Sequence, residues 1–325
     1  MLMHTHEARL AALREELKRR DLHGFVVPIS DEHMSEYVGA YAQRLEWLTG
    51  FAGSAGTAVV LMEAVNGPGA AIFVDGRYTI QVAEQVDGAL FAYQSVPQTS
   101  PAQWLGENAP PGARIGYDAW LHGKPWADAA ARALAARGAA LVAVEDNPID
   151  AIWADRPAPS PAPAFIQPES LAGRSGEAKR ADIADWLARE GLDAVAITAL
   201  DSIAWLLNIR GSDVDRTPVA LSFVLAHADG TADLFIAPEK VTPDLRAHLG
   251  NAVRIAPRDA FVPALRALTG KRVAADPVSA VAAIFAELQA AGADVVEARD
   301  PCVLPKACKN PVEQAGHRAA QAQDG

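Results

Sequence analysis

An internal repeat constrains the fold of this chain more than any other feature of its sequence. Trp47–Ser54 reads WLTGFAGS and aligns without a gap on Trp205–Ser212, which reads WLLNIRGS; four of the eight positions are identical. Each copy follows a helical pattern and a short apolar strand and precedes another strand, so duplication is favoured over chance similarity. The first half carries about 12 additional residues, which fall in the polar segment 30–46, a long loop or a short helix.

A proline-rich segment divides the two halves. Residues 147–168 contain six prolines in 22 positions, a composition that is incompatible with a helix or a central strand. This segment is therefore predicted to be an extended linker, with Ile149, Ile152 and Trp153 packing its first part against a domain. The predicted organisation is a first domain at 1–146, the linker at 147–168, a second domain at 169–308 and the start of a further domain at 309–325.

Strands and helices alternate along both halves, which is typical of an α/β layer structure. Thr5 and Ser175 are expected to cap the first helix of each half. Asn66-Gly67 and Asp229-Gly230 are turn signals between adjacent strands. Strands are predicted at 24–29, 56–62, 70–74, 193–198, 220–226 and 232–237, and near Phe91, Ile115, Leu141, Val253, Val273 and Val295. Helices are predicted at 79–86, near Gln103, and at 124–137, 243–249, 259–268, 279–290 and from Asn310 onward.

Composition excludes several classes of protein. The formal net charge of −11 disfavours a nucleic-acid or anionic-membrane surface. There is no apolar run of about 18 residues, as a membrane span requires, and the N-terminal residues do not resemble a secretory signal. Cys302 and Cys308 are predicted to be free thiols in a reducing cytoplasm.

The stretch 201–218 carries the candidate functional residues. An apolar helical run breaks at Asn208 and leads into a loop with Arg210, Asp213, Asp215 and Arg216. Arg210 has two readings: a clamp for a carboxylate or peptide carbonyl, or a structural ion pair with Asp213 or Asp215. Asp213 and Asp215 are expected to be solvated carboxylates rather than ligands of a metal ion.

No set of residues forms a convincing catalytic machine. The histidines, His4 and His6 included, lack the paired spacing of a metallopeptidase helix, and there is no nucleophile elbow or phosphate loop. Structural roles are preferred for Arg44, Asp75 and Arg77, with Asp75 expected to cap the following helix. The sequence thus predicts no catalytic and no metal-ligating residue within the chain.

Six segments together resemble the aminopeptidase P (Xaa-Pro aminopeptidase) family, in its long, three-domain, cytosolic form. They span nearly the whole chain in family order. They are SDEHMSEY at 30–37, GFAGSAGTAVV at 50–60, VDGRYTIQVAEQV at 74–86, NPIDAIWADRP at 147–157, ALDSIAWLLNIRGSDVDRTPV at 199–219 and KNPVEQAGHRAAQAQDG at 309–325.

The resemblance implies a fold and an activity. It implies two tandem, related creatinase N-terminal-like domains, each a mixed sheet flanked by helices. A third, "pita-bread" domain of that family binds two divalent metals, commonly manganese, through two aspartates, a histidine and two glutamates, and hydrolyses the bond before a proline in second position. None of these five ligand positions falls within 1–325, so the chain is expected to be a truncated form or fragment that is inactive alone.

The resemblance also suggests where the candidate residues face. Arg210, Asp213, Asp215 and Arg216 are expected at the substrate cleft or at the interface with the catalytic domain. A peptide and the catalytic domain are the expected partners, with a homodimeric full-length protein and a monomeric fragment. Two alternatives are a metal-free peptide- or protein-binding module of the same fold and another pita-bread hydrolase, such as a prolidase or creatinase. The latter usually have one N-terminal domain rather than two.

Overall fold

The chain folds into two compact units, Met1–Pro159 and Ser160–Gly325, and the division lies inside the proline-rich segment. The computed structural model describes residues 5–65 and 69–325. The predicted turn at Asn66-Gly67 and the residue His4 lie outside the described residues.

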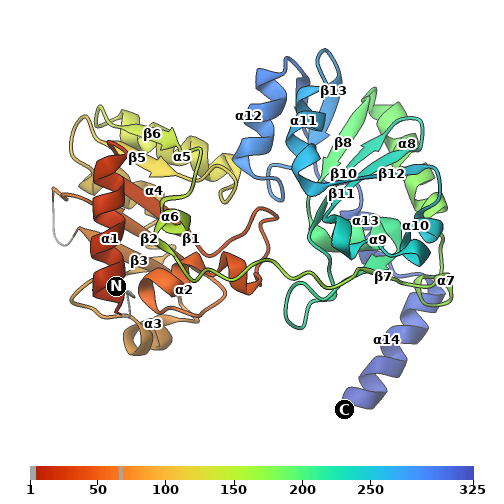
Figure 1. The fold of residues 1–325 in the computed structure, drawn as a ribbon, viewed down its shortest axis with the longest axis horizontal. Helices are drawn as coiled ribbons and strands as arrows, with labels where there is room; N and C mark the ends of the chain where they lie inside the picture. Colours follow the sequence, from red (N-terminus) through yellow and green to blue (C-terminus); the bar gives the residue numbers. More distant parts are fainter. Residues whose placement is uncertain (1–4, 66–68) are drawn as a thin grey trace. The chain divides into compact units, whose positions relative to one another are not determined.

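In the first unit, the described residues form one six-stranded mixed sheet in the order β4-β3-β2-β1-β5-β6. This unit is the red-to-yellow part of the ribbon in Figure 1. Its strands are β1 (Gly24–Pro28), β2 (Gly56–Leu61), β3 (Ala70–Asp75), β4 (Ala92–Val96), β5 (Arg114–Tyr117) and β6 (Ala140–Ala143). The accompanying helices are α1 (His6–Arg19), η1 (Ala40–Ala42), α2 (Arg44–Thr49), α3 (Thr79–Gln85), α4 (Pro101–Asn108), α5 (Lys124–Ala135) and α6 (Pro148–Ile152).

Helices cover both faces of this sheet, so the central strand β1 is buried along its whole length. Phe25 and Val27 point into a core shared with α1, α2 and α3, whereas Val26 points into a core shared with α4 and α5. This alternation explains why GFVVP has no polar position: a strand buried on both faces reads as a continuous apolar run. As predicted, Thr5 caps α1 by accepting a hydrogen bond from the amide of Ala8.

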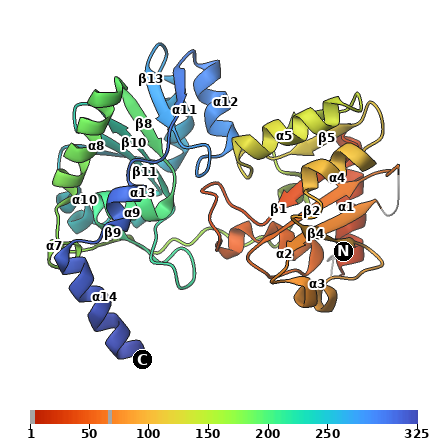
Figure 2. The same ribbon diagram turned by 180° about the vertical axis from the view of Figure 1, so that it is seen from behind.

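The second unit contains a six-stranded sheet in the order β12-β11-β10-β8-β13-β14, together with a two-stranded pair, β7 and β9. This unit is the green-to-blue part of the ribbon in Figure 2. The strands are β7 (Phe165–Ile166), β8 (Ala194–Ile197), β9 (Ile209–Arg210), β10 (Ser222–His227), β11 (Ala232–Ile236), β12 (Val253–Ala256), β13 (Arg272–Ala275) and β14 (Asp294–Glu297). The helices are α7 (Glu169–Ala172), α8 (Gly176–Glu190), α9 (Leu200–Leu207), η2 (Pro238–Lys240), α10 (Pro243–Leu249), η3 (Arg258–Ala260), α11 (Phe261–Arg266), α12 (Ala282–Ala290), α13 (Val303–Ala307) and α14 (Pro311–Asp324).

The two sheets have the same topology, which confirms the predicted duplication. In each sheet the first strand pairs antiparallel with the second, and the second pairs antiparallel with the third. In each sheet the remaining neighbours are parallel. A detail beyond the strands is repeated too: Ser30 donates to the carbonyl of Leu121 at 2.6 Å, and Thr198 donates to the carbonyl of Ser279 at 2.8 Å.

The repeated segments form equivalent corners. Trp47 and Trp205 lie in α2 and α9, and each helix ends in a left-handed residue, Gly50 with φ 87° and Asn208 with φ 51°. Glycine and asparagine are the residues that adopt this conformation most readily, which explains why they align. The first copy is preceded by the segment 30–43, which is a loop containing only the short η1.

The proline-rich segment departs from the prediction in one respect. Residues 148–152 form the helix α6, although the proline content was expected to exclude a helix. Pro148 occupies the first turn, where the missing amide hydrogen costs nothing, and Asn147 caps the helix by accepting from the amide of Ile149. The predicted packing of Ile149, Ile152 and Trp153 on the first unit is confirmed, and Trp153 stacks on Trp47.

Candidate functional site: the Arg210 cleft

Arg210 lies at the corner that follows α9. Its neighbour Asn208 is locked in place: the side-chain oxygen accepts from Lys179 Nζ at 2.6 Å, and the side-chain nitrogen donates to the carbonyl of Arg174 at 2.8 Å. The chain then runs into β9, where Arg210 pairs with Phe165 of β7. The position of Arg210 therefore depends on Asn208, which has a left-handed backbone and a side-chain amide that is hydrogen-bonded through both its oxygen and its nitrogen.

Arg210 does not form the ion pair that one reading of the sequence offered. Its Nη1 donates to the carbonyls of Ala204 at 2.9 Å and Ile209 at 2.8 Å. Burial lowers the pKa of Arg210, and the charge of Glu313 opposes this effect. An arginine remains protonated under such conditions. The result is a half-buried cation oriented by backbone carbonyls.

Asp213 has a structural role instead. Its side chain is 0% exposed and forms an ion pair with Lys240, which is 2% exposed, across 2.5 Å. The second carboxylate oxygen accepts from the amide of Leu221 at 2.7 Å, and Lys240 also donates to the carbonyls of Ser160 and Ala162. This pair fastens the first residues of the second unit to its core.

The other two predicted residues point to solvent. Asp215 and Arg216 are exposed in a tight turn closed by a bridge between Val214 and Thr217, and Arg216 has φ 58°. The four predicted residues thus do not form one face: Arg210 lines a cleft, Asp213 is inside, and Asp215 and Arg216 are on a surface loop.

The cleft beside Arg210, called here the Arg210 cleft, has a volume of about 710 Å³. It lies between α9, the segment 217–219 and α14. The residues that line it include the apolar Leu171, Ala204, Trp205 and Val219 and the charged Lys179, Asp201, Arg210, Lys306, Lys309 and Glu313. An apolar wall with a few converging charges is the usual make-up of a site for a small molecule or a peptide segment.

Lys179 is a residue of this cleft that no sequence motif singles out. It is 1% exposed, and its Nζ lies 2.9 Å from the carbonyl oxygen of Trp205 and 4.5 Å from the centre of the Trp205 ring. Burial lowers the pKa of Lys179 to about 8. The spacing of Lys179 with Ile183 and Leu187, at successive steps of four on the inward face of α8, is the signal that marks it as buried.

The far wall of the cleft is the first part of α14. Asn310 caps this helix in a capping box with Glu313, and its side chain also donates to the carbonyl of Ala172 in α7 at 2.9 Å. An ion pair between Lys306 and Asp201 connects the preceding helix α13 to α9. These contacts fix the direction in which α14 leaves the unit.

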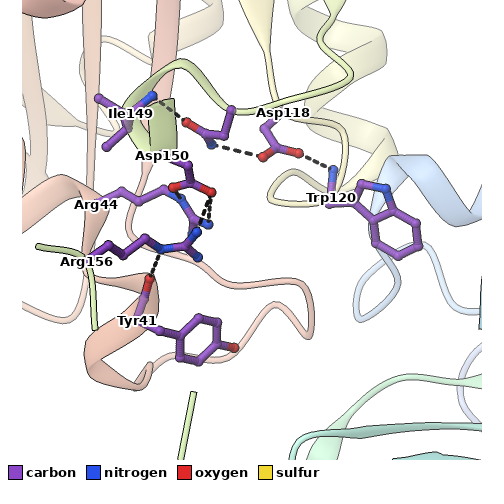
Figure 3. Close-up of polar contacts among 8 residues, drawn as sticks. Tyr41, Arg44, Asp118, Trp120, Ile149, Asp150 and Arg156 are labelled. Atoms are coloured by element: carbon purple, nitrogen blue, oxygen red, sulfur yellow. Dashed lines mark hydrogen bonds and ion pairs between the residues drawn. The ribbon is translucent and has the colours of Figure 1, made fainter. Parts of the chain in front are cut away.

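A polar network in the first unit holds the start of the proline-rich segment. Asp150 accepts two hydrogen bonds from Arg44, at 2.7 and 2.9 Å, and one from Arg156 at 2.7 Å (Figure 3). Arg156 also donates to the carbonyl of Tyr41 at 2.8 Å. Burial alone would lower the pKa of Arg44, but the hydrogen bonds and charge of Asp150 outweigh it and raise that pKa. These contacts therefore support the structural role that the sequence predicted for Arg44.

Asp118 joins this network from the end of β5. It accepts from the side chain of Asn147 and from the amide of Trp120, both at 2.9 Å (Figure 3). Burial raises the pKa of Asp118. In the second unit Asp276 takes the same place, because it accepts from the amides of Val278 and Asp300. A contact made in both copies is part of the shared scaffold.

Two further predictions are settled by local contacts. Asp75 was expected to cap α3, and this is wrong: its carboxylate accepts from the amide and the side chain of Arg77, and α3 begins after Tyr78 without a side-chain cap. Cys302 and Cys308 are free thiols, as predicted.

Within residues 5–65 and 69–325, no group of three or more His, Cys, Asp or Glu side chains is placed to hold a metal ion. In the same residues, no helix combines the length and apolarity needed to cross a membrane.

Comparisons with known proteins agree with this architecture. The family model of the creatinase/prolidase N-terminal domain matches residues 9–152, and a second model of the same description matches residues 155–313. The probable Xaa-Pro aminopeptidase P of Aspergillus clavatus is 36% identical over 98% of this chain and 49% of that protein. The corresponding protein of Aspergillus niger is 35% identical over 98% of this chain and 52% of that protein.

A solved structure matches both units. The crystal structure of an X-prolyl aminopeptidase from Caenorhabditis elegans, described as a cytosolic enzyme with a di-nuclear active site, aligns with a TM-score of 0.89 and 27% identity. It covers 97% of this chain and 53% of that chain. The chain thus spans about half the length of the relatives that it matches. It belongs to the creatinase/prolidase N-terminal domain family, which it contains twice in tandem, and over nearly its whole length it is similar to Xaa-Pro aminopeptidase P.

Proposed function

We propose that this chain forms the two N-terminal domains of an Xaa-Pro aminopeptidase, a metallopeptidase that removes the first residue from peptides with proline in second position. The observation that carries the proposal is the 36% identity to a probable Xaa-Pro aminopeptidase P over 98% of the chain. The fold match to an X-prolyl aminopeptidase over both units supports it further.

In this proposal the chemistry belongs to a third domain outside residues 1–325. That domain would hold two divalent metal ions, with manganese as the expected metal, and these would supply Lewis-acid chemistry for the hydrolysis of a peptide bond. The two domains described here hold that domain and shape the entrance for the peptide. The full-length protein is proposed to be a cytoplasmic homodimer.

The Arg210 cleft is the proposed contact with the catalytic domain. The helix α14 corresponds to the first helix of that domain in the proposal, and α14 lines the cleft and is fixed to α7 through Asn310. Arg210 is then a positive group beside the junction, available to a carboxylate or carbonyl from the catalytic domain or the substrate, and the buried Lys179 adds positive charge to the same cleft. The domain borders at 146, 168 and 308 are part of the same proposal.

The test compares the full-length protein that contains this chain with the chain 1–325 alone. Release of the first residue is measured from a peptide with proline in second position and from the same peptide with alanine there, with manganese added. The full-length protein is expected to cleave only the proline peptide and to lose this activity with a chelator, and the chain 1–325 is expected to cleave neither. Chelator-sensitive turnover by 1–325, or no turnover by the full-length protein, would contradict the proposal.

Arg210 is tested in the full-length protein by Arg210→Ala. The variant is expected to lower turnover of the proline peptide about tenfold or more, because one charge-assisted contact contributes about 1.5–3 kcal/mol. Arg189→Ala, in the exposed last turn of α8, is the matched control. Normal turnover and normal thermal stability of Arg210→Ala would remove Arg210 from the proposed junction.

A further inference from the structure

A second cleft of the second unit differs in chemistry from the Arg210 cleft, although Asn208 lines both. It has a volume of about 690 Å³ and lies between the first turn of α8, the β10–β11 turn and the end of α10. This volume is within the range of about 300–1,000 Å³ that is common for ligand sites. We call it the α8 cleft.

Arg180, which lines the α8 cleft, is a buried cation without a hydrogen-bond partner in the described part of the chain. The residue is 9% exposed, and its buried Nε makes no hydrogen bond there. Burial lowers its pKa, the charge of Glu177 opposes this effect, and the guanidinium stays charged. Buried polar groups in folded proteins normally have hydrogen-bond partners, so the free Nε is unusual. An acceptor that comes from outside the chain would satisfy this group.

The first turn of α8 reinforces the same charge. Ser175 caps the helix by accepting from the amide of Ala178, and the first-turn amides of Gly176 and Glu177 lie at the positive end of a 15-residue helix. The guanidinium of Arg180 folds back over this turn, since its Nη1 lies 3.6 Å from the point that a Cβ on Gly176 would occupy. Backbone amides and a guanidinium on one wall form the usual arrangement for binding an anionic group.

The rim of the α8 cleft has the opposite charge. Glu169, Glu177 and Asp229 line it, and all three are exposed. The carboxylate of Asp229 already accepts from the amide and hydroxyl of Thr231. A positive wall inside and a negative rim outside complement a ligand with an anionic group at one end and a cationic group at the other, and they disfavour polyanions.

We propose that the α8 cleft binds short peptides in their zwitterionic form. The C-terminal carboxylate lies on Arg180 and the first turn of α8, and the N-terminal ammonium lies at the acidic rim. The cleft volume accommodates a few residues rather than a single small ion. The proposal does not rest on the Arg210 cleft or on the proposed peptidase activity.

The test is calorimetric titration of the chain 1–325 with three probes: trialanine, its C-terminal amide and its N-acetyl form. Trialanine is expected to bind, the amide to bind at least about tenfold more weakly, and the N-acetyl form to bind a few-fold more weakly, because the carboxylate meets the buried charge and the ammonium meets exposed ones. No detectable trialanine binding, or equal binding of trialanine and its amide, would overturn the proposal.

Variants locate the site. Arg180→Gln is expected to weaken trialanine binding about tenfold or more and to abolish the preference over the amide. Arg189→Gln, the same substitution at the exposed end of α8, is the control and is expected to bind like the unchanged chain. Asn251 is exposed and lines the cleft, so the larger side chain of Asn251→Trp is expected to block the cleft and to weaken trialanine binding. This variant tests the site even if Arg180→Gln does not fold. Undiminished binding in Asn251→Trp and in a folded Arg180→Gln would place the peptide elsewhere.

Discussion

The buried pair of Asp213 and Lys240 makes a sharp stability prediction. Asp213→Ala leaves Lys240 charged and 2% exposed with only carbonyl oxygens as partners, and it removes the acceptor of the Leu221 amide. Breaking a buried pair by removing one partner costs about 3–5 kcal/mol. Lys240→Met leaves the buried Asp213 carboxylate without its cation and is expected to lower the free energy of unfolding by a similar amount.

The double variant separates this explanation from a general packing effect. Asp213→Ala with Lys240→Met removes both charges and leaves only unsatisfied backbone groups, at about 1–3 kcal/mol. It is therefore expected to be more stable than either single variant, so that the two effects are far from additive. The exposed pair Arg174–Asp182 supplies the control, Asp182→Ala, which is expected to cost below about 1 kcal/mol.

The assay is native-state hydrogen exchange of β10 and β11 at increasing urea concentrations. This method reports the free energy of unfolding of the second unit by itself, which matters because two units need not unfold in one transition. A cost of Asp213→Ala below about 1 kcal/mol, or a double variant as unstable as the sum of the single variants, would refute the reasoning.

Two further predictions concern titrating groups. Burial lowers the pKa of His122 to about 4 from 6.5, so the unfolded chain binds the proton first as pH falls through 6.5. The first unit should then lose up to ~3 kcal/mol between pH 6.5 and 4, a loss that His122→Leu is expected to reduce in urea titrations at the two pH values; equal pH dependence would contradict this. Burial raises the pKa of Cys302 well above its usual value while Cys308 is exposed, so a thiol reagent at pH 8 should label Cys308 at once and Cys302 only after unfolding. Fast labelling of both thiols in the folded chain would show that the second unit is more open than described.

Local sequence rules were sufficient for most elements. The caps at Thr5 and Ser175, the hairpin at Asp229-Gly230 and the helix after Asn310 all depend on contacts between residues close in sequence. The same local rules gave wrong predictions at two places. The helix α6 formed in a proline-rich segment because Pro148 stands in its first turn, and Asp75 satisfied Arg77 instead of capping α3.

The sequence by itself determined the duplicated α/β plan, because repeated apolar runs and the aligned Gly50 and Asn208 require the same corners in both halves. Only the tertiary structure decided the partners of the charged residues. Asp213 lies three residues from Arg210 but pairs with Lys240, and Arg44 pairs with Asp150, more than a hundred residues away. Such choices depend on which side chains the sheet and its helices bring together in a dry interior, and spacing along the chain does not encode them. For the same reason, only the structure shows that Arg210 is bound by carbonyls, that the Nε of Arg180 has no hydrogen-bond partner in the described part of the chain, and that each lines a cleft.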